Sequence, residues 1–171
     1  MGLDLYYQKL SDFILFSPQD STTISFANGG TSTNAGGELE IGVRFFRKWE
    51  ANFTYAYQKI ADNEAFLGFE QASPSTKLTL GLHRNAESGL FLNIWAYYIG
   101  ETAWYIAQPG QMPAVTNVPS FVTVNAYFGY ALNSKMRMGI SISDLLNTNQ
   151  NQFPFAERSG RIITAGLEAN F

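Results

Sequence analysis

The residue types that most often carry catalysis or bind metals are scarce in this chain. His83 is the single histidine, and there is no cysteine. Hydrolytic or acyl-transfer chemistry would need a nucleophile and an orienting acid brought to His83 by the fold. A metal site would need a cluster of His, Cys or carboxylate ligands, and no glycine-rich phosphate-binding loop is present. The sequence therefore predicts no enzyme, no metal site and no cofactor.

The acidic residues are the second group that could form a site. Glu38, Glu40 and Glu50 could gather as one carboxylate group on the inner face of a barrel. Pairing with basic residues across neighbouring strands is the favoured alternative. The candidate partners are Arg44, Arg137 and Arg161.

Aromatic residues in two polar segments are the third group. The segments 61–74 and 102–119 contain Phe66, Phe69, Trp104 and Tyr105. Exposed aromatic rings on a loop can stack on a ligand such as a sugar or a catecholate-like group. Packing of the loops against the rim of a barrel is the alternative, and the sequence leaves both open.

Alternation of apolar and polar residues predicts the elements that position these groups. It is clearest in the run ELEIGVRF at 38–45. In the predicted strand Ser75–Arg84 the alternation places His83 on the polar side with Lys77 and Thr79, where we expect it to form a hydrogen bond. Eight antiparallel strands are predicted, over about Leu3–Leu15, Asn34–Phe46, Trp49–Ile60, Ser75–Arg84, Leu90–Glu101, Ser120–Leu132, Met136–Asn147 and Gly160–Phe171.

The predicted connections alternate between short and long. Three are short, near Arg47, Glu87 and Ser134, and four are long, over about 16–33, 61–74, 102–119 and 148–159. In an up-and-down barrel every second connection lies on the same side, so the long ones share one rim and the short ones the other. Outer-membrane barrels have this arrangement of extracellular loops and periplasmic turns.

Composition favours a barrel in a membrane over a soluble one. Charged residues make up 15 % and aromatic residues another 15 %, against about 25 % charged in typical globular domains. No apolar run approaches the roughly 18 residues of a transmembrane helix. The predicted strands exceed the soluble average of about five or six residues and suit a tilted path across an apolar band of about 25 Å. The sequence therefore predicts an all-β, antiparallel up-and-down transmembrane barrel whose apolar face contacts lipid.

The remaining composition excludes other partners and compartments. The formal net charge is −3 and the 11 basic residues are scattered, so no nucleic-acid partner is expected. The absence of cysteine rules out disulfides. Most strand aromatics are expected on the lipid face or in interfacial girdles, although Trp95 and Tyr97 fit either face. This aromatic set is Trp49, Tyr55, Tyr57, Trp95, Tyr97, Tyr98 and Trp104.

Six motifs in order resemble the C-terminal part of the β-barrel of a TonB-dependent outer-membrane receptor. They are YYQKLSDFILF, FANGGTSTNAGGELEIGVRF, WEANFTYAYQK, VPSFVTVNAYFGYAL, MRMGISISDLLNT and FPFAERSGRIITAGLEANF. The fifth is similar to a Val-x-Asn-Leu-Phe-Asn strand, with Asp144 and Leu146 where Asn and Phe are commoner. The resemblance covers nearly all 171 residues.

The resemblance implies a location in the bacterial outer membrane and energised uptake of a scarce ligand. Ferric siderophores, cobalamin and glycans are the expected classes, with TonB and the small-molecule ligand as partners in the whole receptor. Such barrels have roughly 22 strands, together with a plug domain. The whole chain, 1–171, is therefore expected to be a C-terminal barrel portion without a plug. MGLDLYYQKL lacks the features of a signal peptide, which favours the same interpretation.

A complete eight-stranded outer-membrane barrel with a structural or adhesive role is the alternative. Eight strands can close around a lumen filled by side chains. In either case the last strand resembles the signal read by the outer-membrane assembly machinery. The residues expected to carry this signal are Phe171, Leu167 and Ala169.

Overall fold

The computed structural model describes residues 1–171 except 19–23, 64–68, 87, 107–113, 134, 149–150, 155, 159 and 170–171. The side chains of 15–18, 24, 69, 105 and 106 also lie outside the description. The elements are β1 (Gly2–Pro18), β2 (Ile24–Phe45), β3 (Trp49–Asp62), α1 (Phe69–Ala72), β4 (Thr76–Arg84), β5 (Gly89–Ile99), β6 (Thr102–Ile106), β7 (Ala114–Val118), β8 (Phe121–Ala131), β9 (Met136–Ser143) and β10 (Ile162–Ala169). Within the described ranges, no helix has the length and apolar character needed to cross a membrane.

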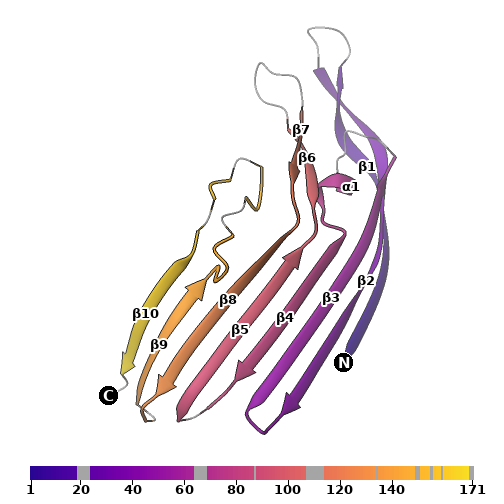
Figure 1. Ribbon diagram of the computed structural model, residues 1–171. Helices are drawn as coiled ribbons and strands as arrows, with labels where there is room; N and C mark the ends of the chain where they lie inside the picture. Colours follow the sequence, from indigo (N-terminus) through magenta and orange to yellow (C-terminus); the bar gives the residue numbers. More distant parts are fainter. Residues whose placement is uncertain are drawn as a thin grey trace.

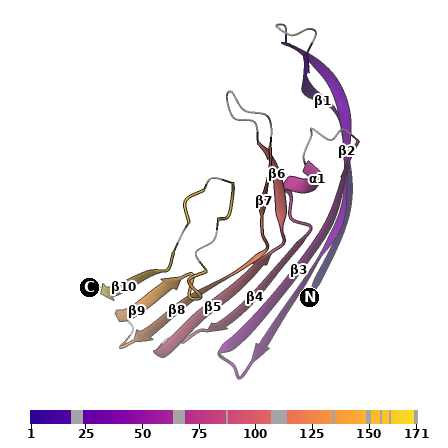
Figure 2. The ribbon, with the colours of Figure 1, turned by 45° about the horizontal axis from the view of Figure 1, so that its top comes forward.

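Eight of the strands form one curved antiparallel sheet, in the order β1-β2-β3-β4-β5-β8-β9-β10 (Figures 1 and 2). The other two, β6 and β7, pair only with each other as a hairpin in the connection from β5 to β8. The prediction of about eight up-and-down strands is confirmed. The sheet is open, because β1 and β10 are its two edges and do not pair with each other.

The connections separate by length onto opposite rims, as predicted (Figure 1). Residues 46–48, 85–88 and 132–135 connect strands at one end, which we call the short-turn rim. The end of β1 and the start of β2, together with α1, the β6–β7 hairpin and the described residues between β9 and β10, lie at the other end, the long-connection rim.

The strand register places most of the aliphatic residues of the eight strands on one side of the sheet. Leu39 is opposite Leu3 and Tyr55, and Phe128 is opposite Leu92 and Ile140. We call this side the apolar face and the other the polar face. Glu38, Thr54, Lys77, Asn125 and Ser141 are among the residues of the polar face. One continuous stripe on each face requires that every strand keep its register.

The apolar face has no protein core to cover it. Among described residues, the apolar side chains that are buried are only Val118, Ala126 and Ala131, whereas Leu3 is 64 % and Leu167 68 % exposed. The accessible surface is 12085 Å², against roughly 8,400 Å² for a compact protein of this mass. An apolar surface of this extent marks a membrane or a partner, and the paired backbone of long strands suits hydrocarbon.

Aromatic side chains on the polar face cover glycines of neighbouring strands. Trp95 pairs with Gly81, and a Cβ built on Gly81 would meet the Trp95 ring at 2.5 Å. The same arrangement joins Phe91 to Gly129 and Tyr127 to Gly139. Trp95 also stacks on Tyr97 with a centroid distance of 6.2 Å and lies edge-on to His83 at 4.6 Å. The register therefore assigns Trp95 and Tyr97 to the polar face, which the sequence left open.

The remaining aromatics of the expected girdle divide between the apolar face and the rim. Trp49, Tyr55, Tyr57 and Tyr98 lie on the apolar face, as expected. Trp104 lies on β6, outside the main sheet.

The predicted connection over 16–33 is too long. β1 continues to Pro18 and β2 begins at Ile24, with Phe16 opposite Phe26. The side-chain types in this region, mainly Gly, Ser and Thr, favour a loop over a strand. The ladder is made by backbone groups, which these residues supply equally well. Asp12 and Gly30 interrupt the pairing, with φ angles of 59° and 77°.

Two other predicted connections contain regular structure. The segment 61–74 includes α1, and 102–119 includes the β6–β7 hairpin. The seventh predicted strand ends too late, since β9 ends at Ser143 and Asp144 adopts a φ angle of 52°. The eighth begins at Ile162, two residues after the predicted start, and its predicted end at Phe171 lies outside the described residues.

The aromatic cover over glycine leads to a test of stability. We expect Gly81→Ala to destabilise the sheet by about 1–3 kcal/mol, because the new Cβ displaces Trp95 from its place between His83 and Tyr97. Gly166→Ala is the matched control, since a Cβ there meets nothing within 4 Å. Urea unfolding in detergent, followed by tryptophan emission, measures both. Equal midpoints for the two variants would contradict the packing role of Trp95.

Candidate functional site

The long-connection rim holds the segments in which ligand-binding aromatics are predicted. α1 is attached to the end of β3 by a reciprocal pair of hydrogen bonds. The backbone N–H of Glu70 donates to Asp62 Oδ2 at 2.8 Å, and the backbone N–H of Asp62 donates to Glu70 Oε2 at 3.4 Å. Gln58 Nε2 also donates to the Pro74 carbonyl at 3.0 Å. These bonds fix the helical turn over the sheet and beside β6, which it contacts.

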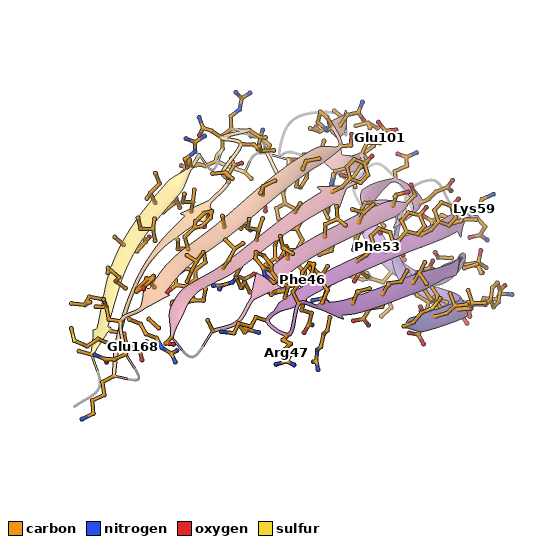
Figure 3. The ribbon with its side chains drawn as sticks, turned by 60° about the horizontal axis from the view of Figure 1, so that its bottom comes forward. Phe46, Arg47, Phe53, Lys59, Glu101 and Glu168 are labelled. Carbon is orange, nitrogen blue, oxygen red and sulfur yellow. The ribbon has the colours of Figure 1, made fainter. Side chains whose placement is uncertain are left out.

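A groove of about 450 Å³ lies between α1 and the β6–β7 hairpin. Its carboxylates are Glu70 and Glu101, and the lining contains no basic side chain. The other described lining groups are hydroxyls and amides, which both donate and accept hydrogen bonds, and small apolar residues, so the groove is polar with a negative charge. Figure 3 shows Glu101 at this rim, far from Phe46 at the short-turn rim. We call this feature the rim groove.

A second groove of about 490 Å³ lies on the other side of β7. It contains Thr116, Phe121, Phe153 and the basic side chain of Arg158. Phe153 packs edge-on against Trp104 with a centroid distance of 6.1 Å. The indole Nε1 of Trp104 donates to Thr102 Oγ1 at 3.1 Å, which orients the ring. The aromatic contact thus joins the β6–β7 hairpin to the segment 144–161 on the side of the second groove.

The turn after β9 fixes the start of that segment. Asp144 is buried at 7 % exposure, and its backbone N–H donates to Asn125 Oδ1 at 3.0 Å. Its carboxylate accepts from the backbone N–H of Thr148 at 2.9 Å and from the Thr148 hydroxyl. The Leu145 N–H donates to the Val124 carbonyl at 2.7 Å. Sequence reasoning missed this turn, although an Asp with a Thr four residues later is a pattern that forms local side-chain turns.

The predicted ligand-contact residues belong to neighbouring elements of this rim. Trp104 is half-buried on β6, and Tyr105 follows it, opposite Val115 of β7. Phe69 is the first residue of α1, which contacts β6. Phe66 lies outside the described residues. The fold brings α1 and β6 together, and ligand contact by these side chains stays a prediction.

The polar face carries the predicted ion pair and a hollow. Arg44 Nε lies 3.1 Å from Glu50 Oε2, as expected for pairing across β2 and β3. Arg161, another candidate partner, donates from Nη2 to the Leu145 carbonyl at 2.7 Å. Glu38 and Lys77 both line a hollow of about 280 Å³ on this face.

His83 faces the polar side as predicted, opposite Asn93. The expectation that it forms a hydrogen bond is not met at Nε2, which is buried without a partner in the described part of the chain. The Trp95 ring covers one side of the imidazole and excludes a polar neighbour there.

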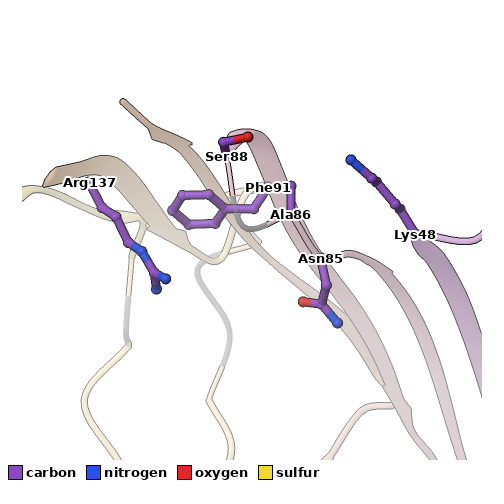
Figure 4. Close-up of a pocket in the computed structure, with 6 residues that line it drawn as sticks. All are labelled: Lys48, Asn85, Ala86, Ser88, Phe91 and Arg137. Atoms are coloured by element: carbon purple, nitrogen blue, oxygen red, sulfur yellow. The ribbon is translucent and has the colours of Figure 1, made fainter. Parts of the chain in front are cut away.

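Another hollow, of about 600 Å³, lies at the short-turn rim (Figure 4). Lys48 and Arg137 lie at its opposite ends, with Phe91 and Asn85 between them. Nothing in this lining pairs a nucleophile with a base. The described residues also contain no group of three His, Cys, Asp or Glu side chains that could hold a metal ion.

The predicted assembly signal falls on the last strand. Leu167 and Ala169 lie on the apolar face of β10, opposite Met138 and Met136. Phe171 lies outside the described residues. The exposed side chains of β10 leave this edge of the sheet accessible.

Comparison with known proteins gives one family and one fold. Residues 1–145 match the family model described as "TonB dependent receptor-like, beta-barrel". The ferripyoverdine receptor of Pseudomonas aeruginosa matches with a TM-score of 0.78 at 14 % identity, over 99 % of this chain and 24 % of that one. The ferric-catecholate import receptor Fiu of E. coli K12 matches with a TM-score of 0.73 at 17 % identity, over 99 % and 25 %.

A third structure, the FrpB iron transporter of Neisseria meningitidis, matches with a TM-score of 0.71 at 15 % identity, over 99 % of this chain and 28 % of that one. The chain therefore spans about a quarter of the length of these receptors. No curated protein matches it in sequence.

The contact between Trp104 and Phe153 can be tested by a double-mutant cycle. We expect Trp104→Ala and Phe153→Ala each to raise amide hydrogen exchange in β6 and in 151–154. The coupling energy should be about 0.5–1.5 kcal/mol. Val115→Ala, an exposed position on the same hairpin, is the control and should leave exchange in 151–154 unchanged. Strictly additive effects of the two aromatic substitutions would show that the rings do not support each other.

Proposed function

The chain belongs to the TonB-dependent receptor family, in its β-barrel part, and from this we propose that it forms the C-terminal portion of an outer-membrane receptor that imports a ferric siderophore. The family match over residues 1–145 is the observation that carries the proposal. Receptors and transporters of this family lie in the outer membrane and are not enzymes. Among the ligands that the sequence left open, the names of the three similar structures favour an iron chelate over cobalamin or a glycan.

The architecture favours the hypothesis that the chain is part of a wide barrel over the hypothesis that it is a complete eight-stranded barrel. A closed eight-stranded barrel requires β1 to pair with β10, and these strands are the unpaired edges of the sheet. We propose that further strands of the same receptor pair with both edges, because unpaired backbone groups in lipid cost several kcal/mol each. A plug domain and a TonB-contacting segment would belong to the rest of the receptor. The structural or adhesive alternative has no observation in its favour.

The rim groove and its aromatic neighbours are the proposed contact site for the chelate. Siderophores present catecholate or amide groups around the metal, and aromatic side chains can stack on such surfaces. Trp104 is held at this rim by Thr102 and Phe153, on the side of the hairpin that carries Thr116 and the second groove with Arg158. The rim groove supplies acceptors from Glu70 and Glu101. Phe66, Phe69 and Tyr105 would add stacking surface from α1, its preceding segment and β6.

Ligand contact is tested in the receptor that carries this chain. We expect Trp104→Ala combined with Tyr105→Ala to weaken binding of the ferric siderophore by at least about tenfold, or about 1.4 kcal/mol, because stacking surface is lost. Tyr130→Ala, an exposed aromatic position at the short-turn rim, should leave affinity unchanged. Titration of intrinsic fluorescence and uptake of radiolabelled iron measure the two effects. Wild-type affinity in the double variant would leave loop packing as the role of these rings.

We also propose that β10 provides the recognition signal for the outer-membrane assembly machinery. Before other strands of the receptor pair with it, the edge of β10 is free, and Leu167 and Ala169 present an apolar stripe on the strand that precedes Phe171. A partner that adds a strand can pair with such an edge.

Substitution of Phe171 tests this role. We expect Phe171→Ser to lower the amount of heat-modifiable receptor in the outer membrane several-fold, whereas Phe171→Tyr, which keeps the ring, retains it. Quantitative immunoblotting of membrane fractions measures both variants. Equal levels for the serine variant and the wild type would remove the claim.

A further inference from the structure

The turn between β2 and β3 places aromatic and basic side chains together at the short-turn rim. Phe46 is 85 % exposed, and Phe46 and Arg47 adopt φ angles of 47° and 57° at the tip of the turn. Phe45 stacks on Trp49 with a centroid distance of 6.2 Å and meets Phe46 edge-on at 5.6 Å. Figure 3 shows Phe46 and Arg47 projecting at this rim.

Arg84 of the neighbouring strand completes this group. It is opposite Trp49 in the register and therefore lies on the apolar face, with its guanidinium carbon 5.9 Å from the centroid of the Trp49 ring. Its Nη1 donates to the Leu90 carbonyl. We call Phe46, Arg47, Trp49 and Arg84 the turn cluster.

The apolar face supplies no counter-charge for Arg84. Among the described strand residues of this face between the two rims, none is a carboxylate, and the basic ones besides Arg84 are Lys9 and Lys59 at the opposite rim. Glu50 lies on the polar face and pairs with Arg44. A guanidinium at the margin of hydrocarbon requires an anion or water at the interface.

The position of the cluster identifies the anion. In an outer-membrane barrel the short turns lie on the periplasmic side, where the leaflet consists of phospholipid. Aromatic side chains settle at headgroup level, anionic lipids attract basic side chains near the surface, and the guanidinium fork binds phosphate in a bidentate manner.

We propose that the turn cluster binds the headgroup phosphate of an anionic phospholipid in the periplasmic leaflet. Arg47 and Arg84 contact the phosphate, Trp49 holds the Arg84 guanidinium, and Phe46 enters the headgroup layer. This inference rests on membership of the family and not on the identity of the imported ligand.

The experiment uses the receptor that carries this chain, purified in detergent and titrated with phosphatidylglycerol in native mass spectrometry. We expect Arg47→Gln and Arg84→Gln each to weaken phosphatidylglycerol binding about fivefold. Lys59→Gln is the matched control, because Lys59 is an exposed base on the same face at the opposite rim. Equal losses in the control variant, or none in the two arginine variants, would overturn the proposal.

Two further arms separate the alternatives. Phosphatidylcholine should bind more weakly to the wild type, and inorganic phosphate should not displace phosphatidylglycerol; displacement would show a site for free anions instead.

Glu87 follows Arg84 by three positions in the sequence and lies outside the described residues. If Glu87 fully neutralised Arg84, Glu87→Gln would raise lipid binding and Arg84→Gln would leave it unchanged. These two results together would contradict the proposal. Arg84→Lys, which keeps the charge without the fork, should bind with intermediate affinity and controls for folding.

Discussion

The need to pair every backbone N–H and C=O group within the sheet governs this structure. In hydrocarbon no water replaces a missing partner, so the strands must be long, antiparallel and in continuous register. The hydrogen-bonded ladder from β1 to β10 pairs the backbone groups between neighbouring strands. The side chains take no part in this pairing, so apolar ones can face lipid and polar ones can face water. The two edge strands are where this pairing stops, and completion there comes from outside the sheet.

The sequence predicted the eight strands, the sorting of connections and the two faces because these follow from a period of two. The run at 38–45 alternates so regularly that its register with β1 and β3 follows the side-chain pattern. The same periodicity could not predict that most of residues 16–33 extend β1 and β2. Their pairing depends on backbone groups, which Gly, Ser and Thr supply without any side-chain signature. The turn at Asp144 combines a local hydrogen bond to Thr148 with one to Asn125, and only tertiary structure brings Asn125 to it.

The candidate site could be located but not assembled from the sequence. The aromatic residues of 61–74 and 102–119 indicated the rim, yet contact between α1 and β6 follows from three-dimensional placement. The partnership of Trp104 with Phe153 joins residues far apart in the chain. For Trp95 and Tyr97 the sequence pattern was compatible with either face of the sheet. Their pairing with Gly81 and Thr79 places both side chains on the polar face.

The alternation of faces also limits how such a chain can change in length during evolution. Loss of one residue inside β8 would reverse the faces on one side of the deletion, for example turning Val122 and Val124 toward the aqueous side and bringing Thr123 and Asn125 into hydrocarbon. Removal of two adjacent residues would preserve the faces at the cost of a shorter strand. Insertions and deletions of any size can therefore accumulate in the connections at the rims, whereas within the strands only even steps keep the two environments apart.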